Sequence, residues 1–284
     1  MTVRLRGRIG LHVLLMAAAL AWLAPLLWAV FTAFRPYDDT QKHGYLSWPK
    51  SLTFSNFTSA WSQAQFPGYF RNTVLVAVPG VLITLLFAAA VAFVVSRFSF
   101  WWNIPLLLLF TAGNLLPQQV IITPLYRLYL DVPGLGSGSG KMYDTLLGLV
   151  LIHVAFQSGF STFVLANYMK TIPHELTEAA LVDGAGVARQ FFQIILPLCR
   201  PPLAALATLL SIWIYNDFFW AIVLISTGSK MPITSALNNL VGNYFTNDNL
   251  LAAGALMTAL PTLIIYFLLQ RQFISGLTLG SGKG

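Results

Sequence analysis

Seven polar or aromatic residues stand in two stretches of the sequence that are otherwise almost free of charge. Amide groups and aromatic rings can hold a polar solute by hydrogen bonds and stacking, and a carboxylate can accept further hydrogen bonds. An apolar stretch has little reason to retain such side chains unless they face protein, water or a solute. The seven residues are Asn114, Gln118, Gln119, Trp213, Tyr215, Asn216 and Asp217.

The same residues also allow a structural interpretation. Asn216 and Asp217 could form hydrogen bonds with a neighbouring helix, and Trp213 and Tyr215 could be packing or interfacial anchors. The sequence leaves both interpretations open.

A glycine-rich segment, GLGSGSGKM at residues 134–142, has the composition of a phosphate-binding loop but not its spacing. That pattern needs a glycine five residues before Gly140, where this sequence has Leu135, and a hydroxyl residue after the lysine, where it has Met142. The carboxyl-terminal LTLGSGKG fails likewise. We therefore expect no nucleotide site and no catalytic residues in this chain.

Histidine and cysteine residues predict no metal or cofactor site. The four histidines, His12, His43, His153 and His174, are far apart in the sequence. The single cysteine, Cys199, excludes an internal disulfide. His153 lies within an apolar stretch, where an ionisable group is a functional candidate, although we favour a neutral histidine bonded to a neighbouring helix.

The composition is that of a membrane protein. Hydrophobic residues make up 57% of the chain, charged residues only 9%, and the mean hydropathy is +0.71, whereas about a quarter of the residues of a soluble domain are charged. The formal net charge is +7, but the 16 Lys and Arg are scattered singly and form no basic stripe for nucleic acid. We interpret them as anchors at the membrane borders.

Charge-free stretches of this sequence predict six transmembrane helices, because about 20 residues cross the ~30 Å hydrocarbon layer. The expected fold class is an all-α integral membrane protein with a single domain over residues 1–284. The uncharged run Ile9–Phe34 exceeds the apolar core of a signal peptide, about 7 to 15 residues, and is taken as an uncleaved span. The expected spans lie at about 11–34, 72–96, 103–125, 145–168, 202–225 and 249–270.

Basic residues near the first span predict the orientation of the chain. Arg4, Arg6 and Arg8 precede this span, whereas Arg35 beyond it is followed by two aspartates. Because basic loops resist translocation, the amino terminus is expected in the cytoplasm, and six spans place the carboxyl terminus on the same side.

The segment 172–197 predicts two short cytoplasmic helices separated by a glycine turn. Glu175 and Glu178 favour the positive amino end of the first helix, and Gly184 and Gly186 can adopt the left-handed backbone that ends it. A second helix is expected over VARQFFQIIL, with Pro197 ending the regular pattern. An ordinary amphipathic loop lying on lipid headgroups is the alternative.

This segment resembles the "EAA…G…I.LP" coupling motif of bacterial ABC importer permeases. The match includes Glu178, Ala179, Ala180, Gly184, Ile194, Leu196 and Pro197, and Asp183 and Ala185 complete the common "DGA". The chain is most similar to the maltose-type (MalG-like) carbohydrate permeases, also in the segments 71–101, 215–224 and 270–284. The resemblance covers nearly the whole chain, although Tyr215 stands where that family often has tryptophan.

The resemblance implies the type I ABC importer permease fold and a subunit that is not itself an enzyme. It would translocate a sugar, a di- or oligosaccharide, across the bacterial cell membrane as a multi-pass protein. The implied partners are a second permease subunit in a heterodimer, two ABC ATPase subunits that hydrolyse ATP, an extracytoplasmic solute-binding protein and membrane lipid. The alternatives are an ion-coupled secondary transporter, an ABC permease for another solute such as glycerol phosphate, and a membrane scaffold.

In that family the EAA helices sit in a cleft of the ATPase. The implied coupling residues are Glu178, Ala179, Ala180, Asp183, Gly184, Ala185, Phe191, Leu196 and Pro197. Polar groups combined with aromatic faces commonly hold sugars. The expected substrate pathway therefore consists of Asn114, Gln118, Gln119, Trp213, Tyr215, Asn216 and Asp217.

Overall fold

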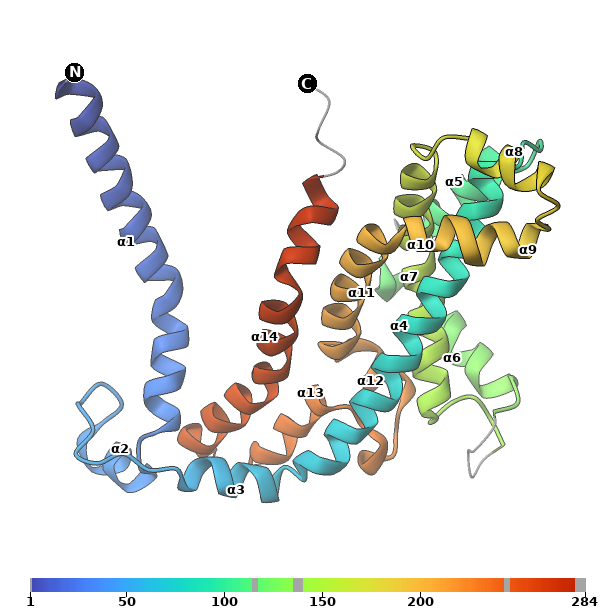
Figure 1. Ribbon diagram of the computed structural model, residues 1–284. Coiled ribbons are helices and arrows are strands. Elements are labelled where there is room, and N and C mark those ends of the chain that lie inside the picture. Colours follow the sequence, from blue (N-terminus) through green and yellow to red (C-terminus); the bar gives the residue numbers. More distant parts are fainter. Residues whose placement is uncertain (1, 114–116, 135–139, 243–245, 279–284) are drawn as a thin grey trace. The chain divides into compact units, whose positions relative to one another are not determined.

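The computed structural model describes residues 2–113, 117–134, 140–242 and 246–278 (Figure 1). Within these ranges the regular elements are helices, as expected for a chain whose backbone polar groups must be paired inside lipid. They are α1 (Thr2–Ala33), α2 (Tyr37–His43), α3 (Ser55–Gln63), α4 (Phe66–Arg97), α5 (Asn103–Gly113), η1 (Gln118–Ile121), α6 (Ile122–Asp131), α7 (Leu146–Met169), α8 (Glu175–Val182), α9 (Val187–Arg189), η2 (Gln190–Ile195), α10 (Leu196–Leu198), α11 (Arg200–Tyr215), α12 (Phe219–Leu224), η3 (Gly228–Lys230), α13 (Ile233–Ala236), η4 (Leu237–Leu240) and α14 (Asp248–Thr278).

Four helical segments are long and apolar enough to cross a membrane: Gly10–Ala33, Phe66–Arg97, Leu146–Met169 and Asp248–Leu268. Two bent pairs could each add a span. One pair is α5 with the stretch Gln118–Asp131, at 93°, and the other is Val187–Leu198 with α11, at 75°. By length and composition the described chain therefore has four to six candidate spans.

The helices differ from two of the expected spans. The stretch expected as a span at 103–125 contains the end of α5 and then Pro117, which lacks an N–H and precedes the short helix η1. The stretch expected at 202–225 is not one helix either, because α11 ends at Tyr215 and α12 starts at Phe219.

The chain divides into two compact units. One comprises residues 1–67 and 236–260, and the other comprises residues 68–235 and 261–284. We call them the first unit and the second unit. The expected coupling residues, and those expected pathway residues that the structure describes, all lie in the second unit.

A buried arginine organises the first unit. Arg35 is 1% exposed, and its Nε donates a hydrogen bond to the carboxylate of Asp39 at 2.8 Å. Its backbone carbonyl accepts hydrogen bonds from the amides of Asn56 (2.8 Å) and Asn249 (3.0 Å). The charge of Arg35 is thus paired, and its backbone joins the end of α1 to α3 and to the start of α14.

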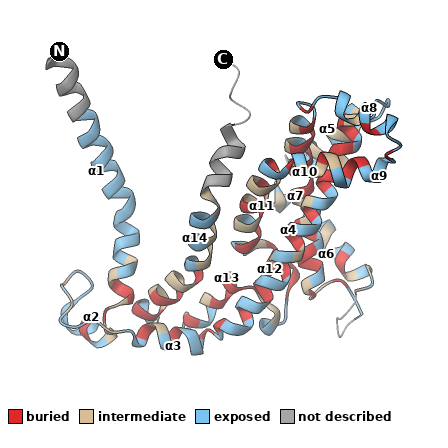
Figure 2. Cartoon of the chain, in the orientation of Figure 1, coloured by how far each residue is buried: buried red, intermediate tan, exposed pale blue. Residues whose placement is uncertain are grey.

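Helix α7 is the central helix of the second unit. More than half of its most apolar stretch, 56%, is buried by the chain, whereas the corresponding stretch of α1 is 0% buried (Figure 2). It packs against α5, α11 and α12. Because α7 touches all three, its inward side chains meet residues from distant parts of the sequence.

The start of α7 is fixed by two adjacent residues, Asp144 and Thr145. The hydroxyl of Thr145 accepts a hydrogen bond from the Gly148 N–H at 2.9 Å and so caps the helix. The Asp144 carboxylate accepts bonds from the N–H groups of Ser226 (2.9 Å) and Thr227 (2.8 Å) and from Lys230 Nζ (2.9 Å). Burial raises the pKa of Asp144, but the bonds from Thr227, Lys230 and Ser226 outweigh it and hold the pKa below its usual range. The charged carboxylate therefore ties the start of α7 to the segment that follows α12.

Candidate functional site

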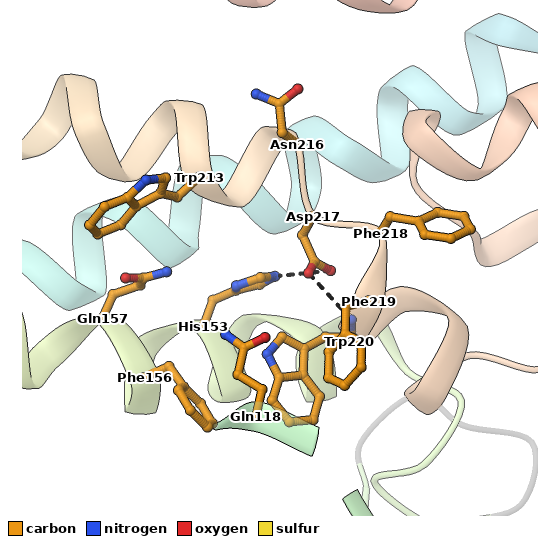
Figure 3. Close-up of a pocket in the computed structure, with 10 residues that line it drawn as sticks. All are labelled: Gln118, His153, Phe156, Gln157, Trp213, Asn216, Asp217, Phe218, Phe219 and Trp220. Carbon is orange, nitrogen blue, oxygen red and sulfur yellow. Dashed lines mark hydrogen bonds and ion pairs between the residues drawn. The ribbon is translucent and has the colours of Figure 1, made fainter. Parts of the chain in front are cut away.

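A cavity of about 600 Å³ lies within the second unit, in the size range of small-molecule sites. Its walls come from η1, α7, the end of α11, the break after α11 and α12 (Figure 3). The lining residues are Gln118, His153, Phe156, Gln157, Trp213, Asn216, Asp217, Phe218, Phe219 and Trp220. We call it the membrane pocket.

The break between α11 and α12 creates one wall of the membrane pocket. Asn216 directly follows the last residue of α11, and its side-chain amide donates to the carbonyl of Ile212 at 2.8 Å. The Asp217 carboxylate then accepts from the N–H groups of Trp220 (3.3 Å) and Ala221 (3.2 Å), which α12 leaves without a helical partner. An interrupted helix is stable in an apolar setting only if its free backbone groups are paired, and Asp217 pairs two of them.

Asp217 also faces a histidine from α7. The Nε2 of His153 lies 3.5 Å from Oδ2 of Asp217, and the two side chains are 5% and 11% exposed. His153 therefore fits both interpretations, because it lines the membrane pocket and also lies beside Asp217.

Two carboxamides of the membrane pocket have no hydrogen-bond partner in the described part of the chain. They belong to Gln118, on η1, and to Gln157, on α7. Figure 3 shows both side chains among the residues that line the membrane pocket. These amides are available to water or to a solute.

The membrane pocket includes only part of the expected pathway set. Gln118, Trp213, Asn216 and Asp217 lie together in it, and Asn114 lies outside the described residues. Gln119 is exposed and does not line the membrane pocket.

Tyr215, the remaining expected pathway residue, does not line the membrane pocket. It is 5% exposed and lines a separate, mostly apolar cavity of about 280 Å³, together with residues such as Phe70 and Ser211. Neighbouring residues of a helix point about 100° apart, so Trp213, Tyr215 and Asn216 cannot all face one cavity.

Sequence reasoning missed Gln157 and the aromatic residues Phe156, Phe218, Phe219 and Trp220. The signal that could have found Gln157 is its spacing of four from His153, which places both on one face of α7.

The first half of the expected coupling motif forms helix α8 and a tight turn. The N–H of Ala185 bonds to the carbonyl of Ala180 at 2.8 Å, and the N–H of Gly184 bonds to that of Leu181 at 3.0 Å. This pair of bonds is the Schellman ending, which needs a left-handed residue at Gly184, where φ is +77°. The expectation for Gly184 is confirmed.

The expectation for Gly186 is wrong. Its φ is −63° and ψ is 163°, an extended conformation open to other residues. One left-handed residue already reverses the chain here, so that the second glycine is not required by the backbone.

The second half of the motif continues through Pro197 instead of ending there. Helix α9 leads into the π-helical turn η2 and then into α10, which contains Pro197. Proline cannot donate to the carbonyl four residues earlier and clashes with it, and the wider π turn immediately before Pro197 accommodates this. The helical conformation is interrupted at Cys199, between α10 and α11.

The coupling residues differ in how far they reach the surface. Glu178, Ala179, Asp183 and Gly184 are exposed, and Leu196 and Pro197 are half-buried. Ala180, Ala185 and Phe191 are buried. The Phe191 ring lies 5.3 Å from that of Phe93 on α4, so this motif residue belongs to the core of the second unit.

A hollow of about 250 Å³ lies beside α8 and η2. It is lined by Ala180, Asp183, Ala185, Arg189, Gln193 and Ile194. Beside it, Val182 is 88% exposed and Leu181 is 67% exposed. Exposed apolar side chains next to a polar hollow are suited to contact with another protein.

Residues 73–274 match the family model described as binding-protein-dependent transport system inner membrane component. Among curated proteins, the chain is 29% identical to a diacetylchitobiose uptake system permease of Streptomyces coelicolor, over 95% of this chain and 87% of that protein. It is 30% identical to a melibiose/raffinose/stachyose import permease of Bacillus subtilis, over 83% of each chain.

Solved structures show the same fold. One belongs to a bacterial ABC transporter that imports the acidic polysaccharide alginate, with a TM-score of 0.80 and 22% identity over 95% of this chain and 97% of that chain. A second is an alginate ABC transporter in complex with a periplasmic protein that holds an alginate pentasaccharide, with a TM-score of 0.68 and 18% identity over 93% of each chain.

Proposed function

Because the chain belongs to the family of binding-protein-dependent transport system inner membrane components, we propose that it is a transmembrane subunit of an ATP-driven importer that carries a di- or oligosaccharide. It is a multi-pass membrane protein with the fold of ABC importer permeases. Both similar curated proteins named above import oligosaccharides.

The observation that carries the sugar proposal is the membrane pocket. It combines two carboxamides that have no hydrogen-bond partner among the described residues, those of Gln118 and Gln157, with the exposed ring of Trp213. Sugars expose hydroxyl groups at their edges and C–H groups on their faces, so amides and rings complement both. An ion-coupled transporter is the rival, but its ion site would need a carboxylate with oxygens free to coordinate, and both oxygens of Asp217 accept N–H groups of α12.

The coupling segment supports the proposal of two ABC ATPase subunits as partners. The exposed Glu178, Ala179, Asp183 and Gly184 would contact the ATPase, whose hydrolysis of ATP drives transport. The covered residues, Ala180, Ala185, Phe191, Leu196 and Pro197, would hold this surface in shape. The segment is thus a protein-protein joint connected through Phe191 to the core of the second unit.

The remaining proposed partners follow from the importer architecture. A second permease subunit, in a heterodimer, would complete the pathway, and an extracytoplasmic solute-binding protein would deliver the sugar. The similar alginate transporter in complex with a periplasmic protein supports the latter partner.

Gln118→Leu and Asn216→Leu should each lower sugar uptake about 3- to 10-fold. Each removes a polar group that would bond to a sugar hydroxyl, and such a hydrogen bond is worth about 0.5–1.5 kcal/mol. The assay is uptake of radiolabelled raffinose, melibiose and diacetylchitobiose by proteoliposomes that contain the full complex, ATP and the binding protein. Basal ATP hydrolysis should be unchanged.

Gln119→Leu is the matched control, since Gln119 is adjacent and exposed but does not line the membrane pocket. Equal uptake by all three variants and the wild type would move the pathway to other residues. Uptake that needs an ion gradient and no ATP would refute the importer itself.

The proposed orientation, with both termini in the cytoplasm, is testable at two well-exposed positions. In a Cys199→Ser background, Leu46→Cys should react with an impermeant thiol reagent added outside cells, and Val182→Cys should not. The two native side chains are 87% and 88% exposed, so accessibility does not distinguish them. The reverse labelling pattern would overturn the orientation predicted by the basic residues before α1.

A further inference from the structure

We propose that the membrane pocket selects uncharged saccharides and that Gln157 is one of its specificity-determining residues. This inference rests on the proposed function and adds the class of substrate that this subunit accepts.

The charges of the membrane pocket are the first ground. Its ionisable lining residues are His153 and Asp217, and among the lining residues that the structure describes none is Lys or Arg. His153 lies 3.5 Å from Asp217, and both carboxylate oxygens of Asp217 also accept backbone N–H groups of α12. This pair is satisfied within the protein, and the described lining offers no Lys or Arg to a ligand.

The electrostatics of the membrane pocket would therefore disfavour an acidic sugar. A uronate carboxylate in the membrane pocket would lie near the Asp217 carboxylate with no Lys or Arg in the described lining to pair with it, and repulsion between like charges strengthens where water is excluded. An uncharged sugar meets no such penalty.

The second ground is the two carboxamides that have no hydrogen-bond partner in the described part of the chain. Gln118 and Gln157 come from different elements and both line the membrane pocket. A carboxamide carries two donors and an acceptor and no charge, and a sugar hydroxyl likewise both donates and accepts. Polar groups in an apolar setting are costly when unpaired, so these amides favour a ligand rich in hydroxyl groups.

The aromatic residues are held in place by their own neighbours. The Trp213 ring lies 5.5 Å from that of Phe160, and the Trp220 ring lies 5.2 Å from that of Phe156. The Trp213 ring, which is 41% exposed, can cover the C–H face of a sugar while the amides bind its edge, whereas Trp220 is 1% exposed and shapes the wall behind it. Gln157 lies four residues after His153 on α7, so it faces the same space.

The test is a binding titration on the purified complex, followed by tryptophan fluorescence because Trp213 and Trp220 line the membrane pocket. The probes are matched trisaccharides: raffinose and maltotriose, which are neutral, and trigalacturonate, which is acidic. We expect the better neutral sugar to bind at least 10-fold more tightly than trigalacturonate. Gln157→Leu should weaken the neutral sugar several-fold, and Gln157→Lys should reduce the preference for it at least 10-fold.

Gln119→Lys adds the same charge outside the membrane pocket and should leave the preference unchanged. The proposal is overturned if trigalacturonate binds the wild type as tightly as the neutral sugars, if no probe binds, or if both Gln157 variants behave as the wild type. Failure of the proposed function would look different: ATP and the binding protein would stimulate no uptake, whereas this inference alone fails when uptake is ATP-driven and the binding preference is absent.

Discussion

Gly184→Val should lower ATP-driven sugar uptake at least 10-fold while the protein still inserts into the membrane. Gly184 has φ +77°, a backbone conformation that costs other residues about 1–2 kcal/mol and β-branched residues more. Space is not the obstacle, because a Cβ at this position would meet nothing within 4 Å. The valine should unwind the Schellman turn and displace the exposed residues of α8 that we expect to contact the ATPase.

Two matched variants separate backbone strain from a general effect of mutation. Gly184→Asn should retain most uptake, since asparagine tolerates the left-handed conformation. Gly186→Val places the same side chain two residues later, where φ is −63° and a Cβ would again meet nothing within 4 Å. Uptake and co-purification of the ATPase are the measurements, and normal values for Gly184→Val would show that the turn is not part of the coupling joint.

Phe191→Ala should destabilise the protein by about 3–5 kcal/mol, the usual range for removing a buried phenylalanine from a core. Phe191 is 6% exposed and its ring lies 5.3 Å from that of Phe93. Its loss leaves a cavity between η2 and α4, so both thermal stability and uptake should fall. The readouts are the unfolding midpoint of the detergent-purified protein and ATP-driven uptake.

Phe192→Ala is the matched control, because Phe192 is the next residue and is 56% exposed. Its ring contact with Phe191, at 4.7 Å, limits the expected loss of stability to about 1.5 kcal/mol or less. Phe192→Ala should therefore spare folding, and any fall in its uptake would report contact with the ATPase. Equal unfolding midpoints for the two variants would contradict the buried position of Phe191.

The sequence alone determined those features that depend on composition and on local backbone preference. Long uncharged runs had to be membrane helices, since a chain in lipid must pair its own backbone groups, and α1, α4, α7 and α14 follow them. The expected span at 145–168 matches α7 closely, and Gly184 marked the end of α8, because left-handed geometry is a property of a single residue. The coupling motif was equally visible, since it occupies one continuous segment.

Only the tertiary structure decided which side chains meet. Asp217 interrupts what hydropathy presents as one span, because its carboxylate pairs free N–H groups of α12 and faces His153, 64 positions earlier in the chain. Tyr215, two residues from Asp217, lines another cavity, and Gln157 enters the membrane pocket although it belongs to a different helix. Phe191, which the motif assigns to the surface joint, is buried against Phe93. These outcomes depend on how α4, α7, α11 and α12 pack within the second unit, and packing between distant segments leaves no local pattern of residues in the sequence.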